Sequence, residues 1–198
     1  ILGKEIDKVE REDYERIGIL SDTSGLYERM TIEENLNFFA ALRNVPKNSV
    51  RDTLENVRLY DQRKTLVKKC SKGMKQRAVL AASLLHKPEL LFLDEPTSGL
   101  DPATIQEIHK MLRHLNQQGT TIFLTTHNME EADKLCSRIG ILNQGKLIAG
   151  GSPRELKLEY ARDEIEVLTT DRETLKYPKN REGGERIREL LEQGRCLT

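Results

Sequence analysis

Short apolar runs alternate with amphipathic segments along most of this chain. Leu90–Leu93 is continuously apolar and Thr120–Thr125 is β-branched and apolar, which is typical of strands buried on both faces. Ile17–Leu20 is a third run of this kind, followed by a turn-rich segment. Strands that alternate with helices predict an α/β fold with a mostly parallel sheet and right-handed crossovers.

Helix-start signals precede the amphipathic segments. Thr31 with Glu34 is a capping box, and Asp101 before Pro102 combines an N-cap with proline at the first helical position. Similar starts are predicted at Asn128 and Ser152, and further helices at Asn48 and over Gln76–Leu85. The intervening Arg63–Lys75 is rich in lysine and arginine, which is typical of a solvated helical face.

The last part of the chain gives weaker signals. A hairpin is predicted from Ile139–Leu142 and Leu147–Ala149 across an Asn-Gln-Gly turn. Farther on, Ile165–Leu168 predicts a strand and Ile187–Leu191 part of a helix, whereas Asp171–Arg186 is polar and has no clear period.

Composition limits the classes of function. Lysine plus arginine equals aspartate plus glutamate at 32 each, which argues against a protein that binds nucleic acid through bulk positive charge. The longest apolar stretches, such as Ala78–Leu85, are too short to span a bilayer, and no signal-peptide pattern is present. The three cysteines and four histidines lack metal-ligand spacing. We therefore expect a cytoplasmic protein.

Candidate chemistry gathers where the predicted strands end. Asp94 and Glu95 follow an apolar strand, where a carboxylate can hold Mg²⁺ and its neighbour can accept a hydrogen bond from an attacking water. His127 follows the next strand on the same sheet edge, although a lone histidine there is more often structural. Cys70–Gln76 is a glycine-containing turn into a helix, and helix N-termini bind phosphate. Each signal alone is weak.

Together, the order and spacing of these motifs resemble the ATP-binding cassette of ABC transporters. Leu90–Pro102 matches that family's Walker B strand and D-loop almost letter for letter, and Cys70–Gln76 lies where the family has its signature motif. The resemblance runs from Ile17 to about Leu156. It implies a P-loop NTPase-like α/β core over residues 1–158, with a small helical subdomain inserted at about 28–85. Residues 159–198 would be an incomplete accessory tail.

The resemblance also implies roles for individual residues. Asp94 would coordinate Mg²⁺, Glu95 would act as general base for the hydrolytic water, and His127 would contact the γ-phosphate of ATP. Catalysis in such systems is mainly positioning plus electrostatic stabilisation of the phosphoryl group.

Other family positions depart from the usual pattern. Ser71 and Gly73 would cap the γ-phosphate of ATP bound to a second subunit, although Lys72 and Met74 alter the signature between and beside them. Such variants resemble those of drug and bacteriocin exporters. Asp101 would help to join the two ATP sites. The Q-loop glutamine is replaced by Asp22, whose acidic side chain could still bind Mg²⁺ or its water.

The phosphate-binding loop of the family is not found in this sequence. No glycine is followed, after four residues, by Gly-Lys and then Ser or Thr, so the main anchor for the β- and γ-phosphates is missing. The opening Ile1–Ile6 resembles the family's strand after the helix of that loop. We therefore expect an N-terminally truncated cassette that binds MgATP poorly by itself and hydrolyses none.

The leading hypothesis is an ATP-binding and ATP-hydrolysing subunit of an ABC-type export transporter. Its partners would be a membrane permease and a second ATP-binding subunit, on the inner face of the cell membrane. The alternative is a non-catalytic partner that supplies only the signature motif to another subunit's ATP. DNA-repair ATPases share the motifs but insert long coiled coils, whereas residues 22–71 contain no sustained heptads. A translation-associated cassette stays open, and the transported substrate is not readable from the sequence.

Overall fold

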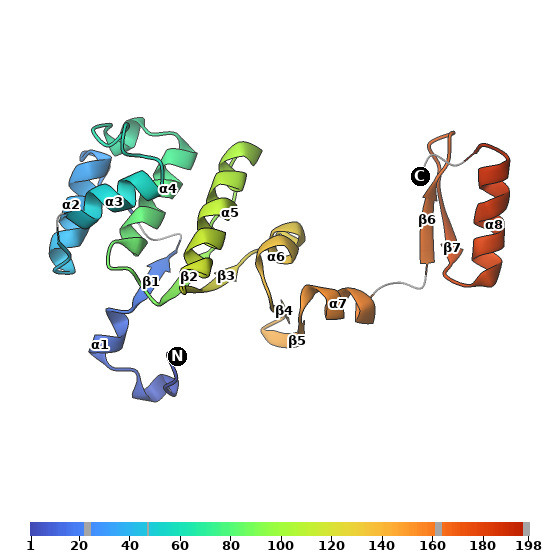
Figure 1. The fold of residues 1–198 in the computed structure, drawn as a ribbon, viewed down its shortest axis with the longest axis horizontal. Coiled ribbons are helices and arrows are strands. Elements are labelled where there is room, and N and C mark those ends of the chain that lie inside the picture. The colour runs from blue at the N-terminus through green and yellow to red at the C-terminus, as the bar shows by residue number, and fades with distance from the viewer. Residues whose placement is uncertain (22–24, 47, 161–163, 196–198) are drawn as a thin grey trace. The chain divides into compact units, whose positions relative to one another are not determined.

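The computed structural model describes residues 1–21, 25–46, 48–160 and 164–195, and it forms two compact units (Figure 1). The first unit is Ile1–Glu131 and the second is Ala132–Thr198. The division of the sequence at residue 158 into a cassette and a tail remains a prediction.

The first unit is built on a parallel sheet of three strands in the order β1–β2–β3. The strands are β1 (Ile17–Leu20), β2 (Leu90–Asp94) and β3 (Thr121–Thr125). Adjacent strands pair in parallel with continuous register, so that the last residue of β2 lies opposite the last residue of β3. The predicted α/β fold with a parallel sheet is confirmed.

Helices of the first unit pack on one another and on the sheet. Helices α2, α3 and α4 gather together in Figure 1, α4 contacts β1, and α5 contacts β3. A Cβ atom at Gly18 in β1 would lie 2.6 Å from the Ser83 carbonyl oxygen, so glycine permits this close approach of strand and helix. The helices are α1 (Arg11–Tyr14), α2 (Ile32–Leu42), α3 (Asn48–Asn56), α4 (Lys72–Leu84), α5 (Pro102–Gln117) and α6 (Met129–Leu135), which crosses into the second unit.

The predicted capping patterns begin real helices. At the start of α2, the Thr31 hydroxyl accepts from the Glu34 N–H at 3.2 Å, and the Glu34 carboxylate accepts from the Thr31 N–H at 2.7 Å. This exchange satisfies two backbone donors that the first turn of a helix leaves without intrahelical partners. Asp101 caps α5 by accepting from the Thr104 N–H, and Ser152 exchanges hydrogen bonds with Glu155 at the start of the helix Pro153–Tyr160. These starts are confirmed.

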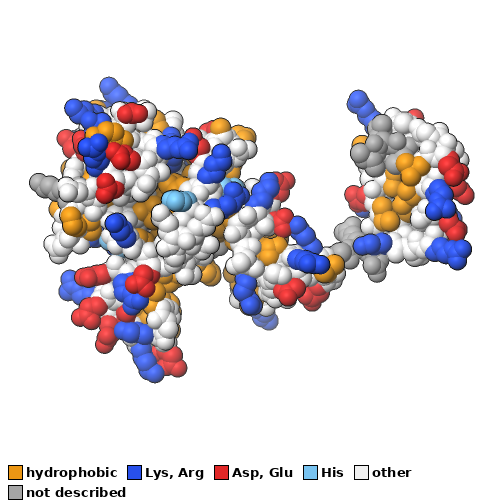
Figure 2. All heavy atoms as spheres, in the orientation of Figure 1, with side chains coloured by type: hydrophobic (Ala, Val, Ile, Leu, Met, Phe, Trp, Pro, Cys, Tyr) orange, Lys and Arg blue, Asp and Glu red, His pale blue; other side chains and the backbone are white. Residues whose placement is uncertain are grey.

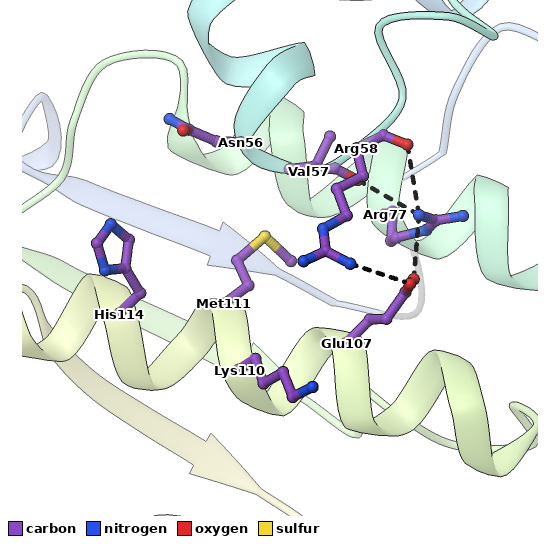
Figure 3. Close-up of a pocket in the computed structure, with 8 residues that line it drawn as sticks. All are labelled: Asn56, Val57, Arg58, Arg77, Glu107, Lys110, Met111 and His114. Atoms are coloured by element: carbon purple, nitrogen blue, oxygen red, sulfur yellow. Dashed lines mark hydrogen bonds and ion pairs between the residues drawn. The ribbon is translucent and has the colours of Figure 1, made fainter.

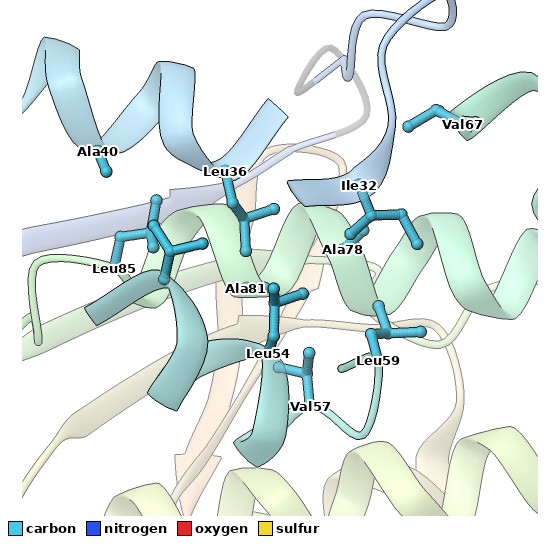
Figure 4. Close-up of a cluster of buried hydrophobic side chains, with 11 residues drawn as sticks. Ile32, Leu36, Ala40, Leu54, Val57, Leu59, Val67, Ala78, Ala81 and Leu85 are labelled. Atoms are coloured by element: carbon cyan, nitrogen blue, oxygen red, sulfur yellow. The ribbon is translucent and has the colours of Figure 1, made fainter. Parts of the chain in front are cut away.

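A cluster of buried side chains joins α2, α3, α4 and the segments that connect them (Figure 4). Leu36 of α2 and Leu54 of α3 are both 0% exposed. Burying an aliphatic side chain this fully stabilises a fold by about 1.5–3 kcal/mol relative to leaving it in water. The cluster consists of Ile32, Leu36, Ala40, Val50, Leu54, Val57, Leu59, Val67, Ala78, Ala81 and Leu85.

The predicted helical face over Arg63–Lys75 is wrong. The segment contains a single turn of 3₁₀ helix at Val67–Lys69, and α4 begins only at Lys72. Val67 is 2% exposed, and its N–H donates to the Met30 carbonyl at 3.0 Å. The many basic residues of this segment mask the signal of Val67, the buried residue whose backbone connects the segment to the loop before α2.

The predicted strand at the opening of the chain is also wrong. The Lys4 N–H donates to the Ile1 carbonyl at 2.8 Å, which closes a turn, and a 3₁₀ helix follows at Ile6–Lys8. The Lys4 ammonium contacts the Asp13 carboxylate at 2.8 Å, so the turn is fastened to α1.

The second unit contains two small antiparallel pairs, each with a helix. The hairpin β4 (Ile139–Asn143) and β5 (Lys146–Gly151) is confirmed, and α7 (Pro153–Tyr160) contacts β5. The predicted strand and helix near the C-terminus are confirmed as β6 (Glu164–Leu168) and α8 (Arg181–Glu192), and β7 (Thr174–Pro178) pairs with β6.

Charged side chains of both signs are interspersed on the face shown in Figure 2. This agrees with the zero net charge of the sequence. In the part of the chain that the structure describes, no helix combines the length and the apolar character needed to cross a membrane.

Candidate functional site

The carboxyl ends of β2 and β3 bring three of the predicted site residues together. Asp94 ends β2 opposite Thr125, which ends β3. The Glu95 N–H donates to the Thr125 carbonyl at 3.1 Å, which extends the pairing by one residue. His127 follows two residues later and contacts Glu95. In parallel α/β sheets this edge is where ligands bind.

Glu95 and His127 are held to each other by two contacts. One carboxylate oxygen of Glu95, Oε1, accepts from the His127 backbone N–H at 3.0 Å and lies 2.8 Å from ring Nδ1. When Glu95 is ionised it only accepts hydrogen bonds, so Nδ1 must then carry the proton and Nε2 is an acceptor in the neutral ring. The His127 side chain is 78% exposed, so a ligand can reach it from solvent.

The backbone of Glu95 is strained. Its φ angle is 47°, in the left-handed region that costs a residue other than glycine about 1–2 kcal/mol. Hydrogen bonds on both sides hold it there, from its own N–H to Thr125 and from the Ser98 N–H to its carbonyl at 3.2 Å. Strain of this kind is retained where the surroundings over-determine the conformation, and it is common at functional sites.

Asp94 is exposed, and the Thr125 hydroxyl donates a short hydrogen bond to its carboxylate. No group of three or more potential protein ligands for a metal occurs among the described residues. A single exposed carboxylate such as Asp94 suits Mg²⁺, which is commonly held by one or two carboxylates and completes its shell with phosphate and water oxygens. Thr125 was missed in the sequence, although its place opposite Asp94 follows from the strand register.

The signature-like turn forms the N-terminus of α4. The Ser71 hydroxyl caps the helix by accepting from the Met74 N–H at 3.2 Å. A Cβ atom at Gly73 would lie 2.9 Å from Cγ2 of Thr104, so glycine lets the start of α4 approach the start of α5. The first turn of a helix offers N–H groups without intrahelical partners, which suits a phosphate ligand.

Asp101 lies at the neighbouring helix start. Its carboxylate caps α5 by accepting from the Thr104 N–H at 3.0 Å and from the Thr104 hydroxyl at 2.7 Å. These hydrogen bonds from Thr104 lower the pKa of Asp101 below its ordinary value. Since Gly73 also faces Thr104, the structure brings the starts of α4 and α5 together. Asp22 lies outside the described residues.

A side-chain amide ties α4 to the turn after β2. The Gln76 amide donates to the Pro96 carbonyl at 2.9 Å. Pro96 directly follows Glu95, so the helix that begins with Ser71 and Gly73 is anchored beside the candidate base. The sequence placed Gln76 at the end of the signature-like turn but did not indicate this contact.

A buried polar cluster behind the site was missed by the sequence analysis. Glu131, in the first turn of α6, is 1% exposed and accepts from the Thr97 hydroxyl at 2.7 Å, and it lies 2.9 Å from Nε2 of His109. Burial by itself raises the pKa of Glu131, but hydrogen bonds from Thr126, Thr97 and His109 outweigh it and lower the pKa below its ordinary value.

Two pockets of the first unit are lined by residues other than these. A pocket of 190 Å³ lies between the end of α3, α4 and α5, where Arg58 and Arg77 contact the carboxylate of Glu107 at 3.4 and 3.3 Å (Figure 3). A larger hollow of 570 Å³ shares Asn56, Met111 and His114 with it. Neither pocket has a predicted site residue among its described lining residues. Asp94 and the side chain of His127 are themselves exposed at the edge of the sheet.

Comparison of the sequence with known proteins shows similarity to ABC transporter ATP-binding proteins. The family model described as ABC transporter matches residues 1–98. A fluoroquinolones export ATP-binding protein of Mycobacterium tuberculosis is 46% identical over 154 residues, which cover 78% of this chain and 51% of the relative. The linearmycin resistance ATP-binding protein LnrL of Bacillus subtilis is 38% identical over 173 residues, or 85% of this chain and 54% of the relative. The chain spans about half the length of these curated relatives.

Solved structures agree with the fold. A structure titled as the ATP binding subunit of an ABC transporter aligns with a TM-score of 0.68 and 26% identity, and covers 81% of this chain and 68% of that chain. The structure of cbiO1 from Clostridium perfringens, part of the ABC transporter complex cbiONQ, aligns with a TM-score of 0.64 and 28% identity over 74% of this chain and 61% of that chain.

Proposed function

This chain belongs to the ABC transporter family, and on that premise we propose that it is part of an ATP-hydrolysing subunit of an export transporter. The observation that carries the proposal is the contact of Glu95 with His127 at 2.8 Å, directly beside Asp94. The relative named for fluoroquinolones export supports export as the direction of transport. A membrane permease and a second ATP-binding subunit are the proposed partners, on the inner face of the membrane.

The geometry supports a division of labour at the sheet edge. Asp94 would hold Mg²⁺ directly or through water, and the ion would supply positive charge that offsets the charge of the phosphates. Glu95 accepts the proton of the attacking water. His127 steadies the Glu95 carboxylate through Nδ1, which leaves Nε2 to face the γ-phosphate when the ring is protonated there. The strained Glu95 backbone keeps the carboxylate at this edge before any ligand arrives.

We also propose that the phosphate-binding loop is supplied by a segment that precedes Ile1 in the gene product. These 198 residues contain no such loop, and Phe123 in β3 is 58% exposed. Parallel sheets are normally covered on both faces, so an exposed β3 is consistent with a further segment packed against it. By itself the 198-residue chain should bind MgATP poorly and hydrolyse none, since the main phosphate anchor is absent.

ATP hydrolysis by the complete gene product tests the proposal. Replacing Glu95 by Gln removes the proton acceptor, so kcat should fall by about 100-fold or more while MgATP still binds. Glu55→Gln is the matched control, because Glu55 is an exposed carboxylate paired with Arg51 on α3 and should leave kcat unchanged. Equal turnover by the Glu95→Gln variant and the wild type would remove Glu95 as the base. Robust turnover by the 198-residue chain would contradict the need for a further loop.

A non-catalytic role is the second candidate, and the exposed N-terminus of α4 with Ser71 as its cap supports it. In that case the complete gene product would not turn over ATP by itself. It would instead associate with an intact ATP-binding subunit when ATP is present. Ser71→Glu, which places a negative charge where phosphate would bind, should abolish that association.

A further inference from the structure

Glu131 is the centre of a polar cluster that joins three segments of the first unit. Its carboxylate accepts from the Thr97 hydroxyl at 2.7 Å and faces His109 Nε2 at 2.9 Å. Thr97 belongs to the turn after β2, His109 to α5, and Glu131 to the first turn of α6. All three residues are buried. Burying a carboxylate is costly unless it is hydrogen-bonded, and both of these contacts fall on one oxygen, Oε1, so Glu131 ties the turn after β2 to α5 and α6 through a single atom.

The cluster is connected to Glu95 on one side. Thr97 follows Glu95 by two residues, within the tight turn that the Ser98 N–H closes on the Glu95 carbonyl at 3.2 Å. The left-handed backbone of Glu95 is part of this turn. Because Glu131 holds the Thr97 hydroxyl, it restrains the turn that fixes the direction of the Glu95 side chain.

The cluster is connected to His127 on the other side. Asn128 caps α6 by accepting from the N–H groups of Glu130 and Glu131 at 3.0 and 3.3 Å, and its own N–H donates to the Thr126 hydroxyl at 3.0 Å. His127 lies inside this capped turn. Glu131 anchors the first turn of α6 in the interior, so it also restrains the segment that carries the imidazole.

We propose that Glu131 is a positioning residue that holds Glu95 and His127 in contact by binding Thr97 and His109. This inference rests on the proposed function for its effect on ATP turnover, but not for its effect on geometry. A purely structural Glu131 would stabilise α6 without governing the contact between Glu95 and His127.

The geometry is tested first, in the 198-residue chain and without ATP, by ¹⁵N NMR of the histidine rings. In Glu131→Gln, the ring nitrogen signals of His127 should shift, because the hydrogen bond from Nδ1 to Glu95 is weakened. Glu130→Gln is the matched control, since it removes a neighbouring exposed carboxylate and should leave the His127 signals unchanged. Altered signals of His109 together with unchanged signals of His127 would overturn the proposal.

A second pair of variants keeps the test decisive if Glu131→Gln does not fold. Thr97→Val deletes the hydroxyl that binds Glu131 and keeps the shape of the side chain, whereas Thr97→Ser retains the hydroxyl. The His127 signals should shift in Thr97→Val and return in Thr97→Ser. The same signals in Thr97→Val as in the wild type would contradict the proposal.

Kinetics of the complete gene product then separate positioning from stability. Misplacement of a reacting group lowers kcat, so Glu131→Gln should lose about tenfold in kcat per folded molecule with KM for MgATP within about twofold. An unchanged kcat would overturn the role in the reaction. If the wild type itself lacks turnover, the proposed function fails, and the NMR comparison still decides whether Glu131 positions His127.

Discussion

The helical cluster of α2, α3 and α4 and the open edge of the sheet organise their side chains in opposite ways. In the cluster, Leu36 and Leu54 are completely buried and contribute through the area they remove from water. At the sheet edge, the side chain of His127 is mostly exposed, and the polar groups are held by directed hydrogen bonds. Most of the stability should therefore lie in the helices, whereas the chemistry lies at an edge that leaves its groups accessible to a ligand.

The exposed groups at the sheet edge are held in place by local hydrogen bonds. Glu95 keeps a strained backbone because its N–H and its carbonyl are both bonded, and its carboxylate accepts twice from His127. Behind it, Glu131 adds a buried anchor. Polar groups held in this way are already oriented for a ligand, although they contribute little to the stability of the fold.

The largest effect on stability is expected for Leu54→Ala. This substitution leaves a cavity in the helical cluster and should lower the free energy of unfolding by about 3 kcal/mol. Urea unfolding followed by circular dichroism measures it. Leu42→Ala is the control, since Leu42 of α2 is 65% exposed and its loss should cost less than about 0.5 kcal/mol. Equal costs for the two variants would show that stability is not concentrated in the cluster.

A smaller effect is expected for Glu131→Gln, and it should depend on pH. At pH 7 the free energy of unfolding of the variant should be about 2 kcal/mol lower than that of the wild type, because the buried hydrogen bonds to a charged carboxylate are weakened. The pKa of folded Glu131 is below its ordinary value of 4.5, so its contribution is present above pH 4.5 and is lost as the pH falls through the folded pKa.

The difference between wild type and Glu131→Gln should therefore shrink on acidification below pH 4.5. Urea unfolding of both proteins at a series of pH values measures it. Titrating groups that do not contact Glu131 are common to the two proteins and cancel in the difference, whereas His109, which lies 2.9 Å from this carboxylate, does not cancel. A gap that widens on acidification would mean that the carboxyl of Glu131 is stabilised in its protonated form.

The capping box of α2 should contribute less again. Thr31→Ala deletes the hydroxyl that accepts from the Glu34 N–H, and it should cost about 1 kcal/mol in the free energy of unfolding. Thr31→Ser keeps the acceptor and should cost a small part of that. If the serine variant is as unstable as the alanine variant, packing of the Thr31 methyl group, and not the cap, secures the start of the helix.

These regions also differ in how far the sequence predicts them. Local rules located the helix starts at Thr31 and Asp101 and the strand ends at Asp94, because caps and apolar runs depend on neighbours in the sequence. The same rules misjudged Val67, whose burial depends on a distant loop. They also missed β7, a short strand with mostly exposed positions and so no apolar run.

The candidate site shows the same limit. The positions of Asp94, Glu95 and His127 at one sheet edge follow from strands of a parallel sheet, and the structure brings them together. The cluster of Glu131, Thr97 and His109 depends on three segments meeting in space. Pairings between residues 22 and 34 positions apart cannot be found from a local pattern.

The smallest effect on stability is expected for Phe123→Ala in the 198-residue chain. The same substitution in the complete gene product tests whether a further segment covers β3. Phe123 is exposed, and its ring centroid lies 5.5 Å from that of Phe92. Loss of the ring should therefore lower the free energy of unfolding by only about 0.5 kcal/mol. If the proposed phosphate-binding segment packs on β3, the same substitution in the complete gene product removes a buried ring and should cost about 3 kcal/mol. Urea unfolding of both proteins, each against its own wild type, measures the two costs. Equal small costs in both would mean that β3 stays exposed, and the phosphate-binding segment would then have to reach Asp94 and Glu95 without covering the sheet.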